Sequence, residues 1–395
     1  MDVEFNIQST ITLKPMKTRK EKKNYIVESL HSGEFYEMPE ICIVAIEMLN
    51  DGSDLLDCEN VLKDRYPNEN VDMIDFIHDL LDLGLVHSVD GKAISSKQPN
   101  PTNNNGLKWI SPKIGRFFFN RCSTSLYFVS FISSLFLFLW KPELFPSYHD
   151  VFVFDLMMYN ILVFLGLTFF LVLIHEIGHV LAVRSENLPT NIEVGHRLFF
   201  VVLETDMSRV WSLPPDRRNR LYLAGMYFDS VLLISGLLLQ LAFASNFLIV
   251  GVSKMVVFST FIRMLYQCCV YMKTDLYYVL ENRSGCYNLM ENGQNFLRRW
   301  LPFVPAVNTS QAFEGEERLV RPYAIFYLIG ILITLGVLVF YNIPLIVHAG
   351  ALVMPGLSEP VSSILFWDAV VFFLQFVIIL SLLAYSYTKK YRLSH

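Results

Sequence analysis

Apolar and polar residues divide this chain of 395 residues into two parts. Residues 1–110 are polar and mixed in charge, whereas nearly every long apolar run lies after Phe117. A helix needs about 20 apolar residues to cross a bilayer, and six runs approach or exceed that length: Thr124–Trp140, Phe152–Val183, Leu221–Phe243, Phe247–Met272, Tyr323–Tyr341 and Ile364–Tyr387. The second run is longer than one crossing needs, which indicates a helix that tilts or projects from the membrane. The pattern predicts an α-helical polytopic membrane domain over residues 117–395, with about six transmembrane helices.

The first 90 residues have the shorter apolar pattern of a small soluble domain. Two strand-like segments, Tyr25–Leu30 and Glu34–Met38, flank Ser32-Gly33, which is typical of a hairpin turn. Three stretches of helical periodicity and a closing strand follow: Ile41–Leu49, Cys58–Tyr66, Val71–Leu81 and Gly84–His87. This order predicts a cytosolic α+β domain of the winged-helix type over residues 1–90. Residues 91–116 include a segment rich in Pro and Asn and are predicted to form a flexible linker.

Composition supports the membrane assignment and excludes one class of partner. Hydrophobic residues make up 53% of the chain, and the mean hydropathy is +0.39, well above an ordinary soluble domain. The predicted second and third helices of the amino-terminal domain and their flanks carry acidic residues that would repel phosphate: Glu59, Asp64, Glu69, Asp72, Asp75, Asp79 and Asp82. We therefore expect no nucleic-acid partner.

The distribution of Lys and Arg predicts how the helices cross the membrane. Basic residues are frequent before the first apolar run, after the second and fourth runs, and in the carboxyl tail. The segment Lys141–Asp150 has one lysine, and Asn342–Ser362 has neither Lys nor Arg. Because cytosolic loops carry the excess of positive charge, we expect a multi-pass protein of the cell membrane with both termini in the cytosol.

Inside the second apolar run, His175 and His179 flank Glu176 in the pattern His-Glu-x-x-His. Two histidines four residues apart lie on one face of a helix and can bind the same tetrahedral zinc ion. The glutamate beside the first histidine is placed to take a proton from the water that such an ion activates. Ionisable residues inside a membrane span are costly and usually functional. The pattern predicts Zn2+ as cofactor, His175 and His179 as ligands, and Glu176 as catalytic base.

A third protein ligand is expected, because zinc in hydrolytic sites has three ligands and one open position. On the predicted topology, His175 and His179 lie in the cytosolic half of their helix, so the third ligand must come from a similar depth. Two acids meet this condition. They are Asp275, at the cytosolic end of the fourth run, and Asp229, about two turns into the third. Both carboxylates are able to bind zinc.

These residues and their surroundings resemble the site-2 protease family of intramembrane zinc metallopeptidases. In that family, a helix that opens with Ala-Gly-Pro-x-x-Asn and a later Asp-Gly step follow the His-Glu-x-x-His helix. Here Ala224–Asp229 is similar to the first motif, with Met226 for Pro and Asp229 for Asn, and Asp275 precedes Leu276 instead of Gly. The resemblance implies that Asp275 is the third ligand and that Asp229 helps to position substrate or water. Because Asp229 carries a carboxylate, it also remains an alternative third zinc ligand.

The order of elements in the amino-terminal domain resembles the PqqD-like domains that recognise precursor peptides in ribosomal peptide modification systems. A generic winged-helix interaction domain is the alternative. Together, the resemblances imply a zinc metalloendopeptidase that cuts a peptide or membrane-associated precursor near the cytosolic leaflet, in maturation or export of a modified peptide. Its partners would be a peptide substrate, membrane lipid, and a modification enzyme or transporter. Residues 191–206, polar and β-rich, are expected to form a hairpin that pairs with extended substrate.

Other functions stay open from the sequence. The same scaffold would suit a non-catalytic peptide exporter or immunity protein that retains the zinc helix, or a regulated protease that acts on a protein such as an anti-sigma factor. The histidines would also suit a structural role in the bundle core. Intact His175, Glu176 and His179 favour the enzyme over the exporter. Residues 297–395 carry no recognisable chemistry and are assigned to packing or a substrate gate.

Overall fold

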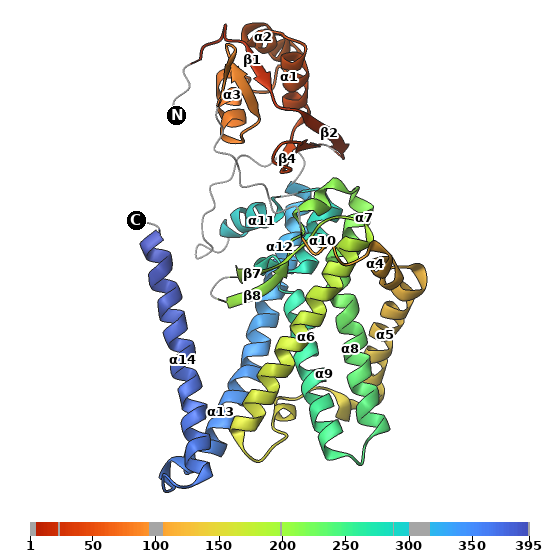
Figure 1. The fold of residues 1–395 in the computed structure, drawn as a ribbon, viewed down its shortest axis with the longest axis vertical. Helices are drawn as coiled ribbons and strands as arrows, with labels where there is room; N and C mark the ends of the chain where they lie inside the picture. Colours follow the sequence, from red (N-terminus) through yellow and green to blue (C-terminus); the bar gives the residue numbers. More distant parts are fainter. Residues whose placement is uncertain are drawn as a thin grey trace. The chain divides into compact units, whose positions relative to one another are not determined.

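A computed structural model describes residues 5–22, 24–94, 106–197, 200–286, 288–299 and 317–393. The contacts between residues separate the chain into two compact units, Met1–Gly106 and Leu107–His395. Figure 1 shows strands and short helices in the first unit and long helices in the second.

The amino-terminal unit is a mixed α/β region. Its strands are β1 (Ile11–Leu13), β2 (Met16–Glu21), β3 (Asn24–Ser29), β4 (Phe35–Met38), β5 (Val86–Val89) and β6 (Lys92–Ala93). Its helices are α1 (Glu40–Asn50), α2 (Leu55–Arg65) and α3 (Met73–Asp82). The strands pair antiparallel in two sheets of order β1-β5-β6 and β2-β3-β4. The unit has its own apolar core, in which Val27, Leu55, Ile77, Leu80 and Leu85 are fully buried.

Local sequence explains where the helices of this unit begin and end. The side chain of Asp54 accepts a hydrogen bond from the backbone of Asp57 at the start of α2, and Asp72 does the same for two amides at the start of α3. Such caps satisfy amides that have no partner within the helix. After α3, Gly84 adopts a φ of 68°, which is the left-handed conformation that glycine favours where a helix stops. The predicted last strand therefore begins at Val86 and not at Gly84.

The described part of the second unit is helical and contains one small hairpin. Its helices are α4 (Pro112–Phe118), α5 (Arg121–Trp140), α6 (Met157–Ser185), α7 (Pro215–Tyr222), α8 (Ala224–Ala242), α9 (Phe247–Gln267), α10 (Asp275–Ser284), α11 (Leu289–Arg298), α12 (Glu317–Val337), α13 (Ile343–Val353) and α14 (Ile364–Leu393). Short 3₁₀ segments are Pro142–Leu144, Tyr148–Val151, Ser208–Ser212, Val270–Met272 and Met354–Ser358, and Leu338–Asn342 is a π turn. Strands β7 (Ile192–Arg197) and β8 (Phe200–Thr205) form the hairpin predicted for residues 191–206.

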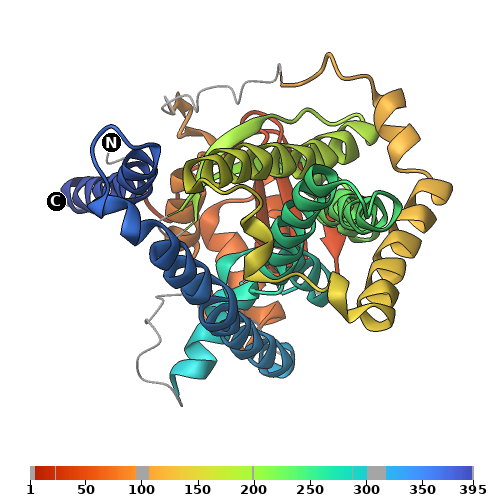
Figure 2. The same ribbon diagram turned by 90° about the horizontal axis from the view of Figure 1, so that it is seen from below.

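Helices α6, α8 and α9 pack side by side, and α5 packs against α8 (Figures 1 and 2). Among the described residues, five helical segments are apolar and long enough to cross a membrane: Arg121–Trp140, Met157–Ser185, Pro215–Ala242, Phe247–Gln267 and Arg318–Ser358. Large apolar side chains lie on their outer surface, as in Phe128 and Leu139 of α5, which are 66% and 83% exposed. Such a surface suits lipid rather than water. The fold class predicted from the sequence is confirmed as a multi-pass helical protein with a small α/β region.

The structure corrects two details of the predicted spans. The segment Asn342–Ser362, predicted to be a loop, is largely helical, because the fifth apolar helix continues through the π turn and α13 to Ser358. The fourth helix ends at Gln267, and Asp275 is the first residue of a separate helix, α10. The 3₁₀ segment Val270–Met272 and Lys273, which has a φ of 53°, lie between the two helices. Helix α14 has a shorter apolar stretch, Ile364–Ile378, so a sixth crossing stays a prediction, as does the orientation.

A buried carboxylate joins the last helix to α6. Asp368 on α14 accepts hydrogen bonds from the backbone amides of Met157 and Met158, at 2.9 Å and 2.6 Å. These amides belong to the first turn of α6, where no carbonyl within the helix can accept from them. The negative charge at a helix amino terminus is also favourable. Asp368 therefore fixes the start of the helix that carries the His-Glu-x-x-His motif.

The pairing of the first two strands predicts the smallest stable form of the amino-terminal unit. Strand β1 pairs with β5, and β2 pairs with β3. A fragment of residues 25–90 therefore lacks β1 and β2, which are outer strands of the two sheets. We expect residues 1–106 to unfold cooperatively as a soluble fragment, and residues 25–90 to be much less stable. Urea unfolding followed by circular dichroism would compare the two. Equal unfolding midpoints would show that β1 and β2 do not contribute to the fold.

Candidate metal centre

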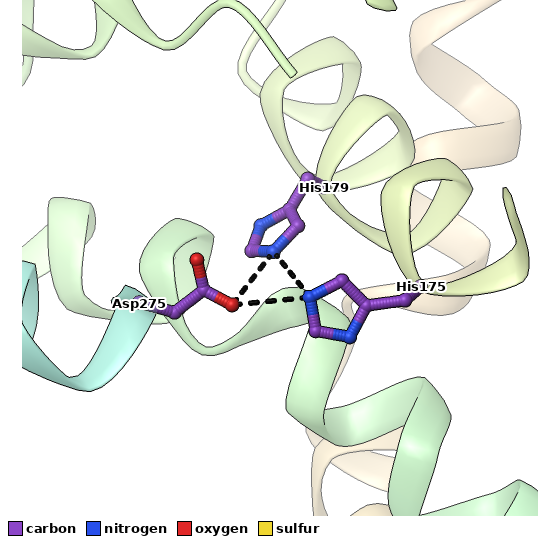
Figure 3. Close-up of side chains that lie close together, drawn as sticks. All are labelled: His175, His179 and Asp275. Atoms are coloured by element: carbon purple, nitrogen blue, oxygen red, sulfur yellow. Dashed lines mark hydrogen bonds and ion pairs between the residues drawn. The ribbon is translucent and has the colours of Figure 1, made fainter. Parts of the chain in front are cut away.

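Three side chains from two helices converge in the second unit. His175 and His179 lie one turn apart on α6, and Asp275 is the first residue of α10. Their donor atoms point toward one another (Figure 3). Nε2 of His175 lies 3.1 Å from Oδ2 of Asp275, Nε2 of His179 lies 3.2 Å from the same oxygen, and the two nitrogens are 3.3 Å apart. All three residues are buried, so the group is able to hold a metal ion.

The far sides of the two imidazoles determine which ring nitrogen carries the proton. Nδ1 of His179 lies 3.0 Å from the carbonyl oxygen of Leu221. Nδ1 of His175 lies 2.9 Å from Oδ2 of Asp229. A carbonyl and a carboxylate only accept hydrogen bonds, so each Nδ1 must donate. A neutral imidazole that donates from Nδ1 has a lone pair at Nε2.

Two lone pairs and a carboxylate oxygen therefore meet within hydrogen-bond distance, with no proton between them when both rings are neutral. Three acceptors at this distance repel one another unless a cation lies among them. Zinc bonds to nitrogen and oxygen are about 2.0–2.1 Å long, so two ligand atoms of a tetrahedral ion are about 3.3 Å apart. The observed separations of 3.1–3.3 Å fit that geometry. The donor set of two imidazoles and one carboxylate also fits zinc.

Asp275 is held in place by Gln267 at the end of α9. The Gln267 amide nitrogen donates to Oδ2 of Asp275 at 2.8 Å, and the Asp275 backbone amide donates to Oε1 of Gln267 at 3.0 Å. Gln267 thus fixes the oxygen that faces the two imidazoles, which is the atom that would bind a metal ion in the carboxylate form.

Close contact between α6 and α8 depends on two glycines. A Cβ atom at Gly225 on α8 would lie 2.3 Å from Nε2 of His175. A Cβ atom at Gly178 on α6 would lie 2.9 Å from the carbonyl oxygen of Ala224. Any side chain at position 225 would therefore displace the imidazole from the group. This contact explains why the Ala-Gly step stands at the start of α8.

Asp229 lies behind His175 and pairs with Arg263 of α9. Nη2 of Arg263 is 2.6 Å from Oδ1 of Asp229, and Nε is 3.1 Å from Oδ2. Asp229 is fully buried, and the Arg263 side chain is 16% exposed. A buried carboxylate without a counterion would be costly, so Arg263 offsets its charge. Asp229 thus contacts Nδ1 of His175, and Asp275 contacts Nε2.

Glu176 lines a cavity of about 330 Å³ beside the group. His179, Asp275 and Thr205 also line it, together with residues of the hairpin and three aromatic side chains, Trp211, Tyr222 and Tyr278. The hydroxyl of Thr205, the last residue of β8, donates to Oε2 of Glu176 at 2.7 Å. The carboxylate is therefore oriented toward the cavity by the end of the hairpin. An open space next to both the donor atoms and a carboxylate is what a hydrolytic site requires.

Sequence reasoning placed the five candidate residues near one another but missed three that support them. Arg263, Gln267 and Thr205 hold Asp229, Asp275 and Glu176, respectively. Arg263 had a signal in the sequence, because an arginine inside an apolar run normally needs a partner. Gln267 and Thr205 had no such signal. Comparisons of the chain with protein-family models, curated proteins and solved structures find no significant match.

The pairing of Asp229 with Arg263 predicts a compensating double substitution. Asp229→Asn or Arg263→Gln alone leaves one buried charge without its counterion, which typically costs about 3–5 kcal/mol. Asp229→Asn/Arg263→Gln removes both charges, and the amide oxygen still accepts from His175. We expect the double variant to regain most of the stability and the metal content that each single variant loses. Thermal unfolding and elemental analysis of the purified proteins would measure both.

Lys254 provides the matched control on the same helix. It pairs with Asp150 at 3.3 Å, but its side chain is 41% exposed. Exposed ion pairs contribute little, so Lys254→Gln should change stability by less than about 1 kcal/mol. Additive losses in the Asp229→Asn/Arg263→Gln variant would show that the two charges do not compensate each other.

Proposed function

We propose that the protein is an intramembrane zinc metalloprotease, with His175, His179 and Asp275 as ligands and Glu176 as catalytic base. The observation that carries the proposal is the meeting of two Nε2 atoms and a carboxylate oxygen beside a cavity lined by Glu176. Asp229 is the competing ligand on sequence grounds. The Asp229 carboxylate already contacts Nδ1 of His175 and pairs with Arg263. These contacts favour Asp275 as the ligand and Asp229 as the residue that orients His175.

The residues of the site would divide the hydrolysis of a peptide bond between them. A bound zinc ion supplies Lewis acidity, which polarises a carbonyl and makes water a stronger acid. Glu176 takes a proton from the attacking water and passes one to the leaving amine. Thr205 holds the carboxylate of Glu176 toward the cavity during both transfers. Asp229 keeps His175 in place from behind, and Gln267 holds the oxygen of Asp275 that faces the two rings.

The hairpin supports a role in binding an extended peptide. Strands β7 and β8 form a sheet of two strands among the described residues, so backbone groups along an outer edge are open to a further strand. Strand β8 packs along α6 and ends at Thr205, next to Glu176. A substrate that adds to this sheet would carry its backbone toward the base. We place the cleavage near the cytosolic leaflet, on the charge distribution of the loops.

Substitution of the base should separate catalysis from metal binding. Glu176→Gln removes the base but no ligand, so we expect about one zinc per chain and a loss of cleavage of at least about 100-fold. His175→Ala, His179→Ala and Asp275→Asn should each lose zinc and activity together. Elemental analysis measures the metal, and amino-terminal proteomics of cells with wild-type or Glu176→Gln protein measures cleavage.

These variants also distinguish the enzyme from an exporter or immunity protein. Identical sets of peptide amino termini in wild-type and Glu176→Gln cells would exclude the protease. Normal zinc content in His175→Ala and His179→Ala would exclude the metal site.

The amino-terminal unit is proposed to recognise a precursor peptide. Its separate core and its acidic α2 and α3 suit a basic or amphipathic peptide. Deletion of residues 1–106 should then slow cleavage of a full-length precursor, while the zinc content stays unchanged because the ligands belong to the other unit. Cleavage rates of the precursor with and without its leader would measure this effect. An unchanged rate with the leader present would assign the unit another role.

A further inference from the structure

A second cavity, of about 860 Å³, lies between α5, α8 and α9. On α8 it is lined by Met226, Tyr227 and Ser230, next to the turn residue Leu223. Gly225 and Asp229, which face His175, are four residues apart and lie on another face of the same helix. No residue of α6 lines the cavity. It is therefore separate from the candidate metal centre.

One end of this cavity is basic. Arg121, the first residue of α5, and Arg220, on α7, both line it. Nη1 of Arg220 donates to the carbonyl oxygen of Phe119 at 3.3 Å, which places this guanidinium at the entry to α5. The amino terminus of this helix of 20 residues adds a partial positive charge at the same place. Two guanidinium groups and a helix amino terminus form an environment that favours an anion.

The rest of the cavity is mainly apolar, and one of its walls lies on the outside of the bundle. Phe128, Phe131, Met226 and Met264 line it, and Phe128 is 66% exposed. An anion-binding end joined to an apolar groove on membrane-length helices matches a molecule with an acidic headgroup and hydrocarbon chains. Basic pockets between transmembrane helices bind the headgroups of acidic lipids in this way. The volume also lies in the range of ligand pockets.

We propose that this cavity binds one anionic phospholipid, with its phosphate between Arg121 and Arg220 and an acyl chain along Phe128, Phe131 and Met264. The bound lipid fills the space between α5 and α8. Since α8 carries Gly225 and Asp229 on its neighbouring face, the lipid supports the helix that packs against His175. The proposal does not depend on the proteolytic function.

Native mass spectrometry of the delipidated full-length protein tests the site with defined lipids. We expect one phosphatidylglycerol to bind more tightly than phosphatidylcholine. A basic side chain near the membrane surface contributes about 1 kcal/mol to binding of acidic lipid, so Arg121→Gln/Arg220→Gln should weaken phosphatidylglycerol binding roughly 10- to 30-fold. Arg217→Gln is the matched control. Arg217 is on α7 too, but it pairs with Glu186 at 3.4 Å and does not line the cavity.

A second variant and a competing anion distinguish a bound phospholipid from other occupants of the cavity. Ser125 is exposed and lines the cavity, so Ser125→Trp should fill the space and weaken lipid binding without a change of charge. Millimolar inorganic phosphate should leave the bound phosphatidylglycerol in place. Displacement by phosphate would show a simple anion site and overturn the proposal. Equal binding of the two lipids, or binding unchanged in both Arg121→Gln/Arg220→Gln and Ser125→Trp, would overturn it as well and leave the cavity to another occupant such as a peptide helix.

Discussion

Two imidazole nitrogens and a carboxylate oxygen meet in the interior of the helical unit, and side chains and a backbone carbonyl from three further helices hold them there. Leu221 and Asp229 orient the two rings from their far sides, and Gln267 orients Asp275 through the same oxygen that faces the rings. These partners lie on or beside α7, α8 and α9. The packing of three helices against α6 is therefore linked directly to the geometry of the group. A metal ion would relieve the repulsion that this packing imposes.

The surroundings of His175 are apolar, so a buried charge near it needs a partner of opposite charge. Asp229 is fully buried, and an isolated carboxylate there would be strongly unfavourable. Arg263 offsets that charge through its ion pair with Asp229. Asp229 in turn contacts Nδ1 of His175, so the pair acts on the ring whose Nε2 faces Asp275. When a histidine binds a metal ion, a carboxylate hydrogen-bonded to its other ring nitrogen makes the imidazole a more basic ligand. The pair Asp229–Arg263 is therefore both a structural requirement of the bundle and a means of tuning the site.

Features that depend only on residues close together in the sequence could be predicted from it. The spacing of His175 and His179 places them on one helix face wherever that helix lies, and the apolar runs indicate the membrane helices by length alone. Strand β2 was missed because its sequence, Met-Lys-Thr-Arg-Lys-Glu, has no alternation of apolar residues and depends on β3. Gln267 and Thr205 were missed because their roles arise only when distant elements pack together. Sequence spacing could not choose between Asp229 and Asp275, since both lie at a suitable depth.

Two departures from the motifs of the family that the sequence resembles have local partners in this fold. Asp229 stands where that family has an amide, and Arg263 supplies the counterion that the added charge requires. Met226 stands in place of a proline, and its side chain lines the cavity between α5 and α8. A carboxylate buried at position 229 needs this counterion whether or not the neighbouring group acts in catalysis. The Asp229–Arg263 pair is therefore explained by the packing of α8 against α9, and the same packing places a carboxylate beside Nδ1 of His175.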